Sequence, residues 1–316
     1  MKWFNKYGIK IISWTIFILS LWLLYRRFFV LKQGFEFTHL KDEFSSAQWL
    51  FGVLAFVLVF ANWGIEAVKW QFVTKPIQSL SYITAFKSVF MGVAVSTVFP
   101  NRTGEFLGKI LVLGKHNKVK GIFASLISSL SQLFITLFCG LLSFIFCRNL
   151  LQHTFNISSE IYFWCISLLV LSLLVYLLLP HIVLFLERFI SKRWMQYIEF
   201  CKNYSFISLL KLYVLSFLRY TVFVLQLYLL FVFFNQHITI MLFIQLASVA
   251  FMLTTVIPTM ALSELFVRSN VGLMIFSTTG ISDEIIVTVY TLLWIINIAL
   301  PALTGFLFGL GMKWKN

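Results

Sequence analysis

The chain has 316 residues, of which 60% are apolar and only 11% are charged, and its formal net charge is +14. A soluble domain carries about 25% charged residues, so this composition excludes an ordinary soluble protein and predicts that the lipid bilayer is its solvent. The basic residues flank apolar segments instead of forming a polar domain, which excludes a nucleic-acid-binding surface and indicates membrane topology.

Six apolar segments are long enough to cross the membrane, which takes about 20 residues in a helix. In chain order they are Ile9–Tyr25, Trp49–Val68, Gly121–Cys147, Ile161–Leu179, Leu212–Phe234 and Ile285–Leu310. Lysines precede the first segment, as in a secretory signal, but no small-residue cleavage site follows it. We therefore expect it to be retained as a span. The pattern predicts an all-α polytopic membrane protein.

Two further apolar segments, 83–113 and 238–276, are each broken near the middle by a proline and then by polar residues. Proline interrupts the helical hydrogen-bond ladder and disfavours helix in the preceding residue. We therefore expect two re-entrant helical hairpins with Pro100 and Pro258 at their tips. The candidate N-caps of the helices that follow are Asn101 in the first hairpin and Thr259 or Ser263 in the second.

The distribution of charge predicts the orientation of both hairpins. If the N-terminus is cytoplasmic, that side collects sixteen basic and two acidic residues, whereas the other side has five basic and six acidic residues. This bias fits the positive-inside rule, provided that each broken segment enters and leaves on one side. The hairpins then point at each other, and both termini are cytoplasmic. Because no targeting peptide is present, we expect a prokaryotic plasma membrane.

An internal repeat supports this arrangement. The sequence STVFP at 96–100 is matched by TTVIP at 254–258, an offset of 158 residues, half the chain length. An acid and a base four residues apart follow each proline. We expect a first repeat in residues 1–158 and an inverted copy in residues 159–316, each with two spans, a hairpin and a third span. Inverted repeats with broken helices recur in secondary transporters.

Charged residues within apolar segments are the candidate site. Each costs about 2.5–3.5 kcal/mol at the bilayer centre on insertion scales, so we expect pairing or function. The hairpins contain Arg102, Glu105, Lys109, Glu264 and Arg268, and the spans contain Glu66 and Arg219.

Two interpretations of the hairpin charges remain open. They line a transport path, or Glu105–Lys109 and Glu264–Arg268 are helical ion pairs without substrate contact. We expect Glu66 to pair with Arg219, and Lys69 to reach the cytoplasmic interface with its ammonium group. The only acid at helical spacing from Arg102 is Glu105, which makes Arg102 the first candidate to hold an anionic headgroup.

The run Pro100-Asn101-Arg102-Thr103-Gly104-Glu105 resembles the P-x-R-x-G-E signature of the lysylphosphatidylglycerol synthase transmembrane (flippase) domain family. The segment from Pro258 to Glu264 resembles that family's second motif, with Met260-Ala261-Leu262 in place of a glycine-rich stretch. The resemblance implies movement of a lipid between leaflets. Because the chain stops at Asn316 directly after its last span, it also implies a stand-alone member without the soluble synthase domain.

We therefore expect a flippase-like translocator of membrane lipids with a polar or anionic, phosphate-containing headgroup. The alternatives are a secondary transporter of a small organic anion and a non-catalytic partner of a separate lipid-modifying enzyme. We expect no catalytic residue, metal or cofactor, because the sequence has no nucleophile–base pair, metal-ligand cluster or phosphate loop. The expected substrate-binding residues are Arg102, Glu105, Lys109, Arg219, Glu264 and Arg268. The expected hairpin breakers are Pro100, Gly104 and Pro258. The expected supporting residues are Glu66, Asn101, Thr103 and Ser263.

Overall fold

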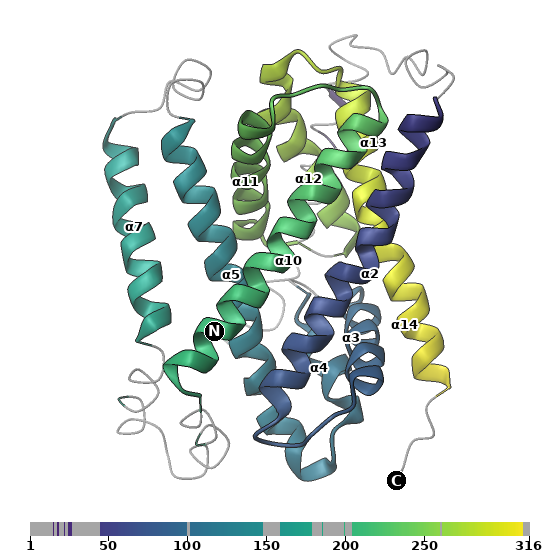
Figure 1. Ribbon diagram of the computed structural model, residues 1–316, viewed down its shortest axis with the longest axis vertical. Helices are drawn as coiled ribbons and strands as arrows, with labels where there is room; N and C mark the ends of the chain where they lie inside the picture. Colours follow the sequence, from purple (N-terminus) through teal and green to yellow (C-terminus); the bar gives the residue numbers. More distant parts are fainter. Residues whose placement is uncertain are drawn as a thin grey trace.

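The computed structural model describes residues 45–99, 102–147, 159–178, 204–259 and 261–311, together with a few isolated positions. Every regular element in these ranges is a helix (Figure 1), which confirms the predicted all-α fold for this part of the chain. The predicted first span, Ile9–Tyr25, lies outside the described residues except for isolated positions, and so do Pro100 and Asn101.

Four helical stretches of the described chain are long and apolar enough to cross a membrane, and they coincide with four predicted spans. They are α2 (Ser46–Thr74), η5 with α5 (Lys115–Asn117 and Lys118–Phe146), α10 (Phe206–Phe233), and the run α13 (Asp283–Trp294), η8 (Ile295–Ala299) and α14 (Leu300–Leu310). The predicted span at 161–179 is the helix α7 (Ser159–Leu177), which packs against α5.

Serine side chains define where several helices begin. Ser45 accepts a hydrogen bond from the backbone N–H of Gln48, whose side chain accepts one from the backbone of Ser45, so α2 starts with a capping box. Ser205 caps α10 in the same position. Such caps satisfy N–H groups that have no partner within the helix, and they define where α2 and α10 begin.

Each broken segment forms two helices joined by a turn. The first contains α3 (Tyr82–Ser96), α4 (Gly104–Lys109) and the 3₁₀ turn η4 (Ile110–Val112), and the second contains α11 (Ile240–Val256) and α12 (Ala261–Phe276). Gln78 accepts hydrogen bonds from the backbone N–H of Gly114 and the side chain of Asn117, which joins both ends of the first segment at one end of the molecule. In Figure 1, α3 and α4 lie in the lower half and α11 and α12 in the upper half.

The start of α4 differs from the sequence expectation. Thr103, and not Asn101, occupies the N-cap position of α4. Arg102 adopts a left-handed backbone conformation with φ of 55°, so the chain turns sharply there before the helix begins. In the second hairpin α12 begins at Ala261, between the two candidate caps Thr259 and Ser263, which are both buried.

Two apolar cores lie on either side of a charged layer, which contains Glu66, Lys69, Glu105, Lys109 and Arg219. One core joins the second hairpin to α10 and α13, and the other joins the first hairpin to α2 and the beginning of α5. The first hairpin packs closely because Gly108 of α4 faces the backbone of Gly92 in α3. Gly305 of α14 lies against the carbonyl of Phe90 in the same way, so the last span is held against α3.

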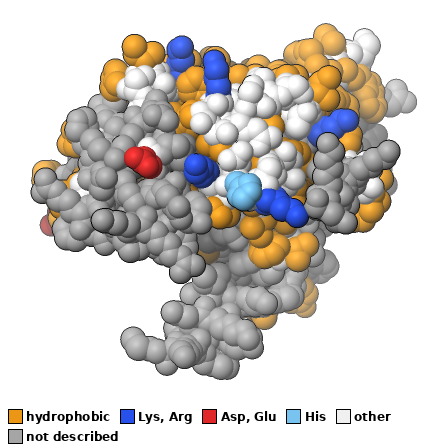
Figure 2. All heavy atoms as spheres, turned by 90° about the horizontal axis from the view of Figure 1, so that it is seen from below, with side chains coloured by type: hydrophobic (Ala, Val, Ile, Leu, Met, Phe, Trp, Pro, Cys, Tyr) orange, Lys and Arg blue, Asp and Glu red, His pale blue; other side chains and the backbone are white. Residues whose placement is uncertain are grey.

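Basic side chains gather at the end of the molecule where α2 ends and α5 begins. Lys75 follows α2 directly, and Lys115, Lys118 and Lys120 lie at the beginning of the α5 span. Figure 2 shows this end from below, with Lys and Arg side chains spread over it. This is the end that the sequence analysis predicts to be cytoplasmic.

Candidate functional site

A cavity of about 400 Å³ lies in the charged layer, where the tips of the two hairpins meet α2, α5 and α10. A second cavity of about 320 Å³ adjoins it under the turn of the second hairpin. Both are lined by Arg102 from the first hairpin and by Thr254, Thr255 and Arg268 from the second. Ligand sites in proteins have volumes of about 300–1,000 Å³, so the space suits a small polar group.

Glu66 of α2 is the centre of a buried charge cluster. Its carboxylate accepts a hydrogen bond of 2.6 Å from Lys109 Nζ and one of 2.9 Å from Arg219 Nη1, and Lys69 Nζ lies 3.4 Å away. Lys109 also forms a 2.6 Å ion pair with Glu105. The expected Glu66–Arg219 pair therefore forms, and so does the pair at helical spacing within α4.

Lys69 lies deeper in the protein than the sequence predicts. Its side chain is 0% exposed instead of reaching the interface, and its ammonium group donates to the backbone carbonyl of Ser128 at 3.3 Å. The reason is that α2 continues to Thr74, so Lys69 lies more than a turn inside the helix and faces α5. Lys69 lines the main cavity, which makes it a functional candidate that sequence reasoning missed.

Arg219 is held in place by a polar chain that crosses three helices. Its Nε donates to Asn62 Oδ1 at 2.8 Å, and Asn62 Nδ2 donates to Asn297 Oδ1 at 2.9 Å. The guanidinium also lies 5.0 Å from the ring centroid of Trp63, a cation–π distance. Asn297 lies in η8, a π-helical segment of the last span. Sequence reasoning missed Asn62 and Asn297. The pattern that could have identified them is a single amide side chain within an apolar segment, which is Trp49–Val68 for Asn62 and Ile285–Leu310 for Asn297.

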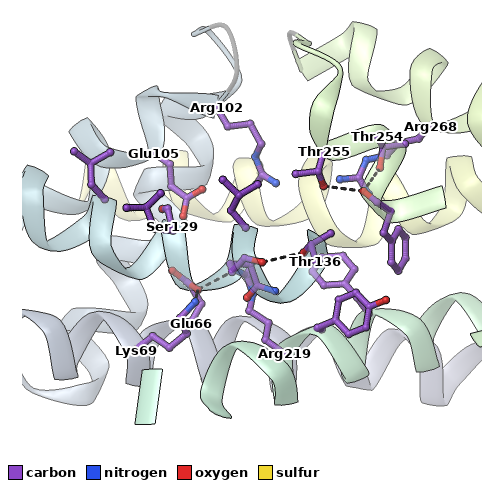
Figure 3. Close-up of a pocket in the computed structure, with 17 residues that line it drawn as sticks. Glu66, Lys69, Arg102, Glu105, Ser129, Thr136, Arg219, Thr254, Thr255 and Arg268 are labelled. Atoms are coloured by element: carbon purple, nitrogen blue, oxygen red, sulfur yellow. Dashed lines mark hydrogen bonds and ion pairs between the residues drawn. The ribbon is translucent and has the colours of Figure 1, made fainter. Parts of the chain in front are cut away.

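Arg102 differs from the other basic residues of the cavity. Its guanidinium extends from the turn of the first hairpin into the cavity (Figure 3). The Nε and Nη2 atoms are buried, and no described residue accepts a hydrogen bond from either of them. Buried polar groups in proteins are nearly always hydrogen-bonded, so these two donors are available to a ligand.

The second hairpin contributes an ion pair. Arg268 donates from Nη2 at 2.6 Å and from Nε at 3.0 Å to Glu264 Oε1, as the spacing of the two residues predicts. Arg268 lines both cavities, and Glu264 lines the smaller one. Pro258 lies in the turn beside them. The pairing satisfies both charges locally, but it leaves part of the guanidinium facing the cavity.

The remaining predicted residues support the hairpins. Gly104 lies against the backbone of Val95, where a larger residue would not fit. Ser263 is buried at the start of α12, and Thr103 is exposed at the start of α4. Gln132 of α5 was not predicted: its Nε2 donates to the carbonyl of Ser216, while its buried Oε1 accepts no hydrogen bond from a described residue.

Comparison with known proteins identifies one family. The model for the lysylphosphatidylglycerol synthase TM region matches residues 8–305. The match includes both hairpins and every member of the charge cluster. No curated protein and no solved structure matches the chain.

Proposed function

The chain belongs to the family of the lysylphosphatidylglycerol synthase TM region, and from this membership and the cavity we propose that it moves a lipid with a polar or anionic headgroup between the leaflets of the membrane. In this proposal both hairpins are re-entrant. The headgroup enters the cavity between their tips, while the acyl chains stay in the bilayer. The family model describes a transmembrane region, and we propose a non-catalytic protein.

The observation that carries the proposal is the guanidinium of Arg102. A buried donor without a partner costs about 1–3 kcal/mol, and more when the group is charged. Two such donors on one guanidinium therefore favour an anionic oxygen ligand, because the planar fork of arginine matches phosphate and carboxylate oxygens. A non-catalytic partner of a lipid-modifying enzyme would not need an unpaired guanidinium in a cavity.

Apolar side chains around the cavity favour a lipid over a small soluble anion. Val98 and Val256, at the tips of the two hairpins, are 73% and 67% exposed. Leu126 lines the main cavity and is also exposed. Leu126 of the main cavity and Val256 of the second cavity are thus apolar and exposed at the same time, as contact with the acyl chains of a bound lipid requires. A fully enclosed polar site would instead suit a solute.

Arg219 and Arg268 are the proposed supports of the anionic part of the headgroup, because both line the main cavity. Glu105 and Glu264 balance part of the positive charge through their ion pairs with Lys109 and Arg268, or exchange a proton during transport. We further propose that the basic end shown in Figure 2 faces the cytoplasm of a prokaryotic cell.

The test is leaflet exchange in proteoliposomes that contain acyl-labelled lipids with different headgroups. We expect faster exchange of anionic-headgroup lipids than in protein-free vesicles. Uptake of a soluble anion such as glycerol 3-phosphate is measured in parallel. Uptake of the solute without lipid exchange would favour the small-anion transporter, and neither activity in correctly inserted protein would contradict the proposal.

A further inference from the structure

The cavity contains more positive charge than negative charge. Its lining residues and their ion-pair partners include three carboxylates and five basic side chains, and the other described lining residues are neutral. The formal excess is therefore two positive charges. The carboxylates are Glu66, Glu105 and Glu264, and the basic residues are Lys69, Arg102, Lys109, Arg219 and Arg268.

The two excess charges lie on different walls. Glu264 and Arg268 balance each other. In the cluster around Glu66, Glu105 and Lys109 of α4 balance each other, which leaves Glu66 with Lys69 and Arg219 and thus one positive charge on the wall formed by α2 and α10. The second is Arg102. Figure 3 shows Arg102 reaching down from the first hairpin, opposite Lys69 and Arg219.

We infer, on the basis of the proposed function, that the preferred headgroup is dianionic: a phosphomonoester or a diphosphate. Buried charge without compensation is costly, and a dianion placed between the two walls neutralises both excess charges. A singly charged phosphodiester leaves one charge uncompensated. A zwitterionic headgroup adds an ammonium group to a cavity that is already positive, and like charges in such a site act against binding.

The hydrogen-bond donors that line the cavity also favour a dianionic headgroup. A phosphomonoester has three terminal oxygens that are strong acceptors. Arg102 offers the two unpartnered donors Nε and Nη2 from one side. On the other side, the Arg219 side chain lines the cavity and is 11% exposed, with Nε hydrogen-bonded to Asn62 and Nη1 hydrogen-bonded to Glu66.

Equilibrium binding tests the inference independently of transport. The purified protein in nanodiscs is titrated with acyl-labelled phosphatidic acid, phosphatidylglycerol and phosphatidylcholine that have identical chains. We expect phosphatidic acid to bind about tenfold more tightly than phosphatidylglycerol, as one additional charge-assisted contact provides, and phosphatidylcholine to bind most weakly. Equal binding of the three lipids would overturn the inference.

Two variants distinguish the effect of the cavity's net charge on lipid preference from the loss of a single contact between Arg268 and the headgroup. Arg268→Gln lowers the excess to one positive charge, so the preference for phosphatidic acid over phosphatidylglycerol should largely disappear. The double variant Glu264→Gln/Arg268→Gln keeps the formal excess at two positive charges. It should therefore still bind phosphatidic acid more tightly than phosphatidylglycerol, whatever the absolute affinities are. An unchanged preference in Arg268→Gln, or its loss in the double variant, would contradict the inference. Thermal melting of both variants confirms that they are folded.

A soluble competitor tests whether the dianionic ligand is a lipid headgroup or a soluble molecule. Glycerol 3-phosphate has the same phosphomonoester but no acyl chains, and we expect it to compete at least about 100-fold less well than phosphatidic acid, because it lacks the apolar contacts. Equal competition would assign the dianion to a soluble ligand and overturn the lipid assignment. Selective binding of phosphatidic acid without leaflet exchange would contradict translocation and leave the dianion inference standing.

Discussion

Glu66 connects three helical elements through its carboxylate. Lys69 comes from α2 itself, Lys109 from the second leg of the first hairpin and Arg219 from α10. All four side chains are buried, so solvent screens their interactions only weakly. The removal of one partner from a buried ion-pair cluster leaves the others uncompensated, which is far more costly than the loss of an exposed pair.

We therefore expect Glu66→Gln to destabilise the protein by about 3–5 kcal/mol. The variant keeps the size of the side chain, but it replaces one acceptor oxygen by an NH2 donor and leaves three basic residues around a neutral amide. Thermal melting in detergent measures the effect. Glu160→Gln is the matched control, because Glu160 is exposed at the start of α7 and should melt like the wild type. Equal melting of the two variants would contradict this description of the cluster.

The sequence predicted the ion pairs within single helices better than the contacts between different helices. The Glu105–Lys109 and Glu264–Arg268 pairs follow from a four-residue spacing, because neighbouring turns of a helix bring such residues together. The Glu66–Arg219 pair was expected from the need of buried charges for partners. The burial of Lys69 and the Asn62–Asn297 hydrogen bond depend on which helices pack side by side, and sequence spacing contains no such information.

At the level of elements, the first hairpin depends on the close approach of its two legs. Gly108 of α4 and Gly92 of α3 face each other with no room for a side chain at position 108. The position of Arg102 depends on this packing, because the guanidinium extends from the turn between the two legs. A change in the distance between the legs therefore moves the charge that lines the cavity.

We expect Gly108→Ala to destabilise the protein by about 1–3 kcal/mol, the usual cost of overpacking. The added methyl group would contact the backbone of Met91 and Gly92. Gly309→Ala is the control, because a methyl group there has no neighbour within 4 Å and alanine favours helix. If thermal melting ranks the two variants in the opposite order, the close packing of α3 and α4 is wrong.

The prolines identified the broken segments, but not the details of the breaks. Pro258 lies between α11 and α12, as expected, and the break near Pro100 separates α3 from α4. The actual start of α4 depends on the left-handed conformation of Arg102. Arginine has no special preference for that conformation, so the sequence gives no local signal for it.

At the level of the whole molecule, the charged layer separates two apolar cores, and each core includes one hairpin. This arrangement suits two hairpins that enter from opposite sides, with the cavity at their tips. The inverted repeat of residues 1–158 and 159–316 stays a prediction. Its direct consequence concerns topology, because both ends of a re-entrant hairpin lie on the same side of the membrane.

Cysteine accessibility tests this topology in a background in which the four native cysteines are replaced. Lys75→Cys and Lys115→Cys flank the first hairpin, and both should react with an impermeant maleimide from the cytoplasmic side. His237→Cys and Ser282→Cys flank the second and should react only from the outside. Labelling of Lys75→Cys and Lys115→Cys from opposite sides would show that the first segment crosses the membrane.

The central claim is that Arg102 holds the headgroup of a lipid in transit, and the rate of leaflet exchange in proteoliposomes tests it most directly. We predict that Arg102→Ala lowers the exchange of anionic-headgroup lipids by at least about tenfold, the effect of one lost charge-assisted hydrogen bond. Lys211→Ala, which removes an exposed basic residue of α10, should exchange lipids like the wild type. Equal rates for Arg102→Ala and the wild type, with both proteins folded and inserted, would contradict the account.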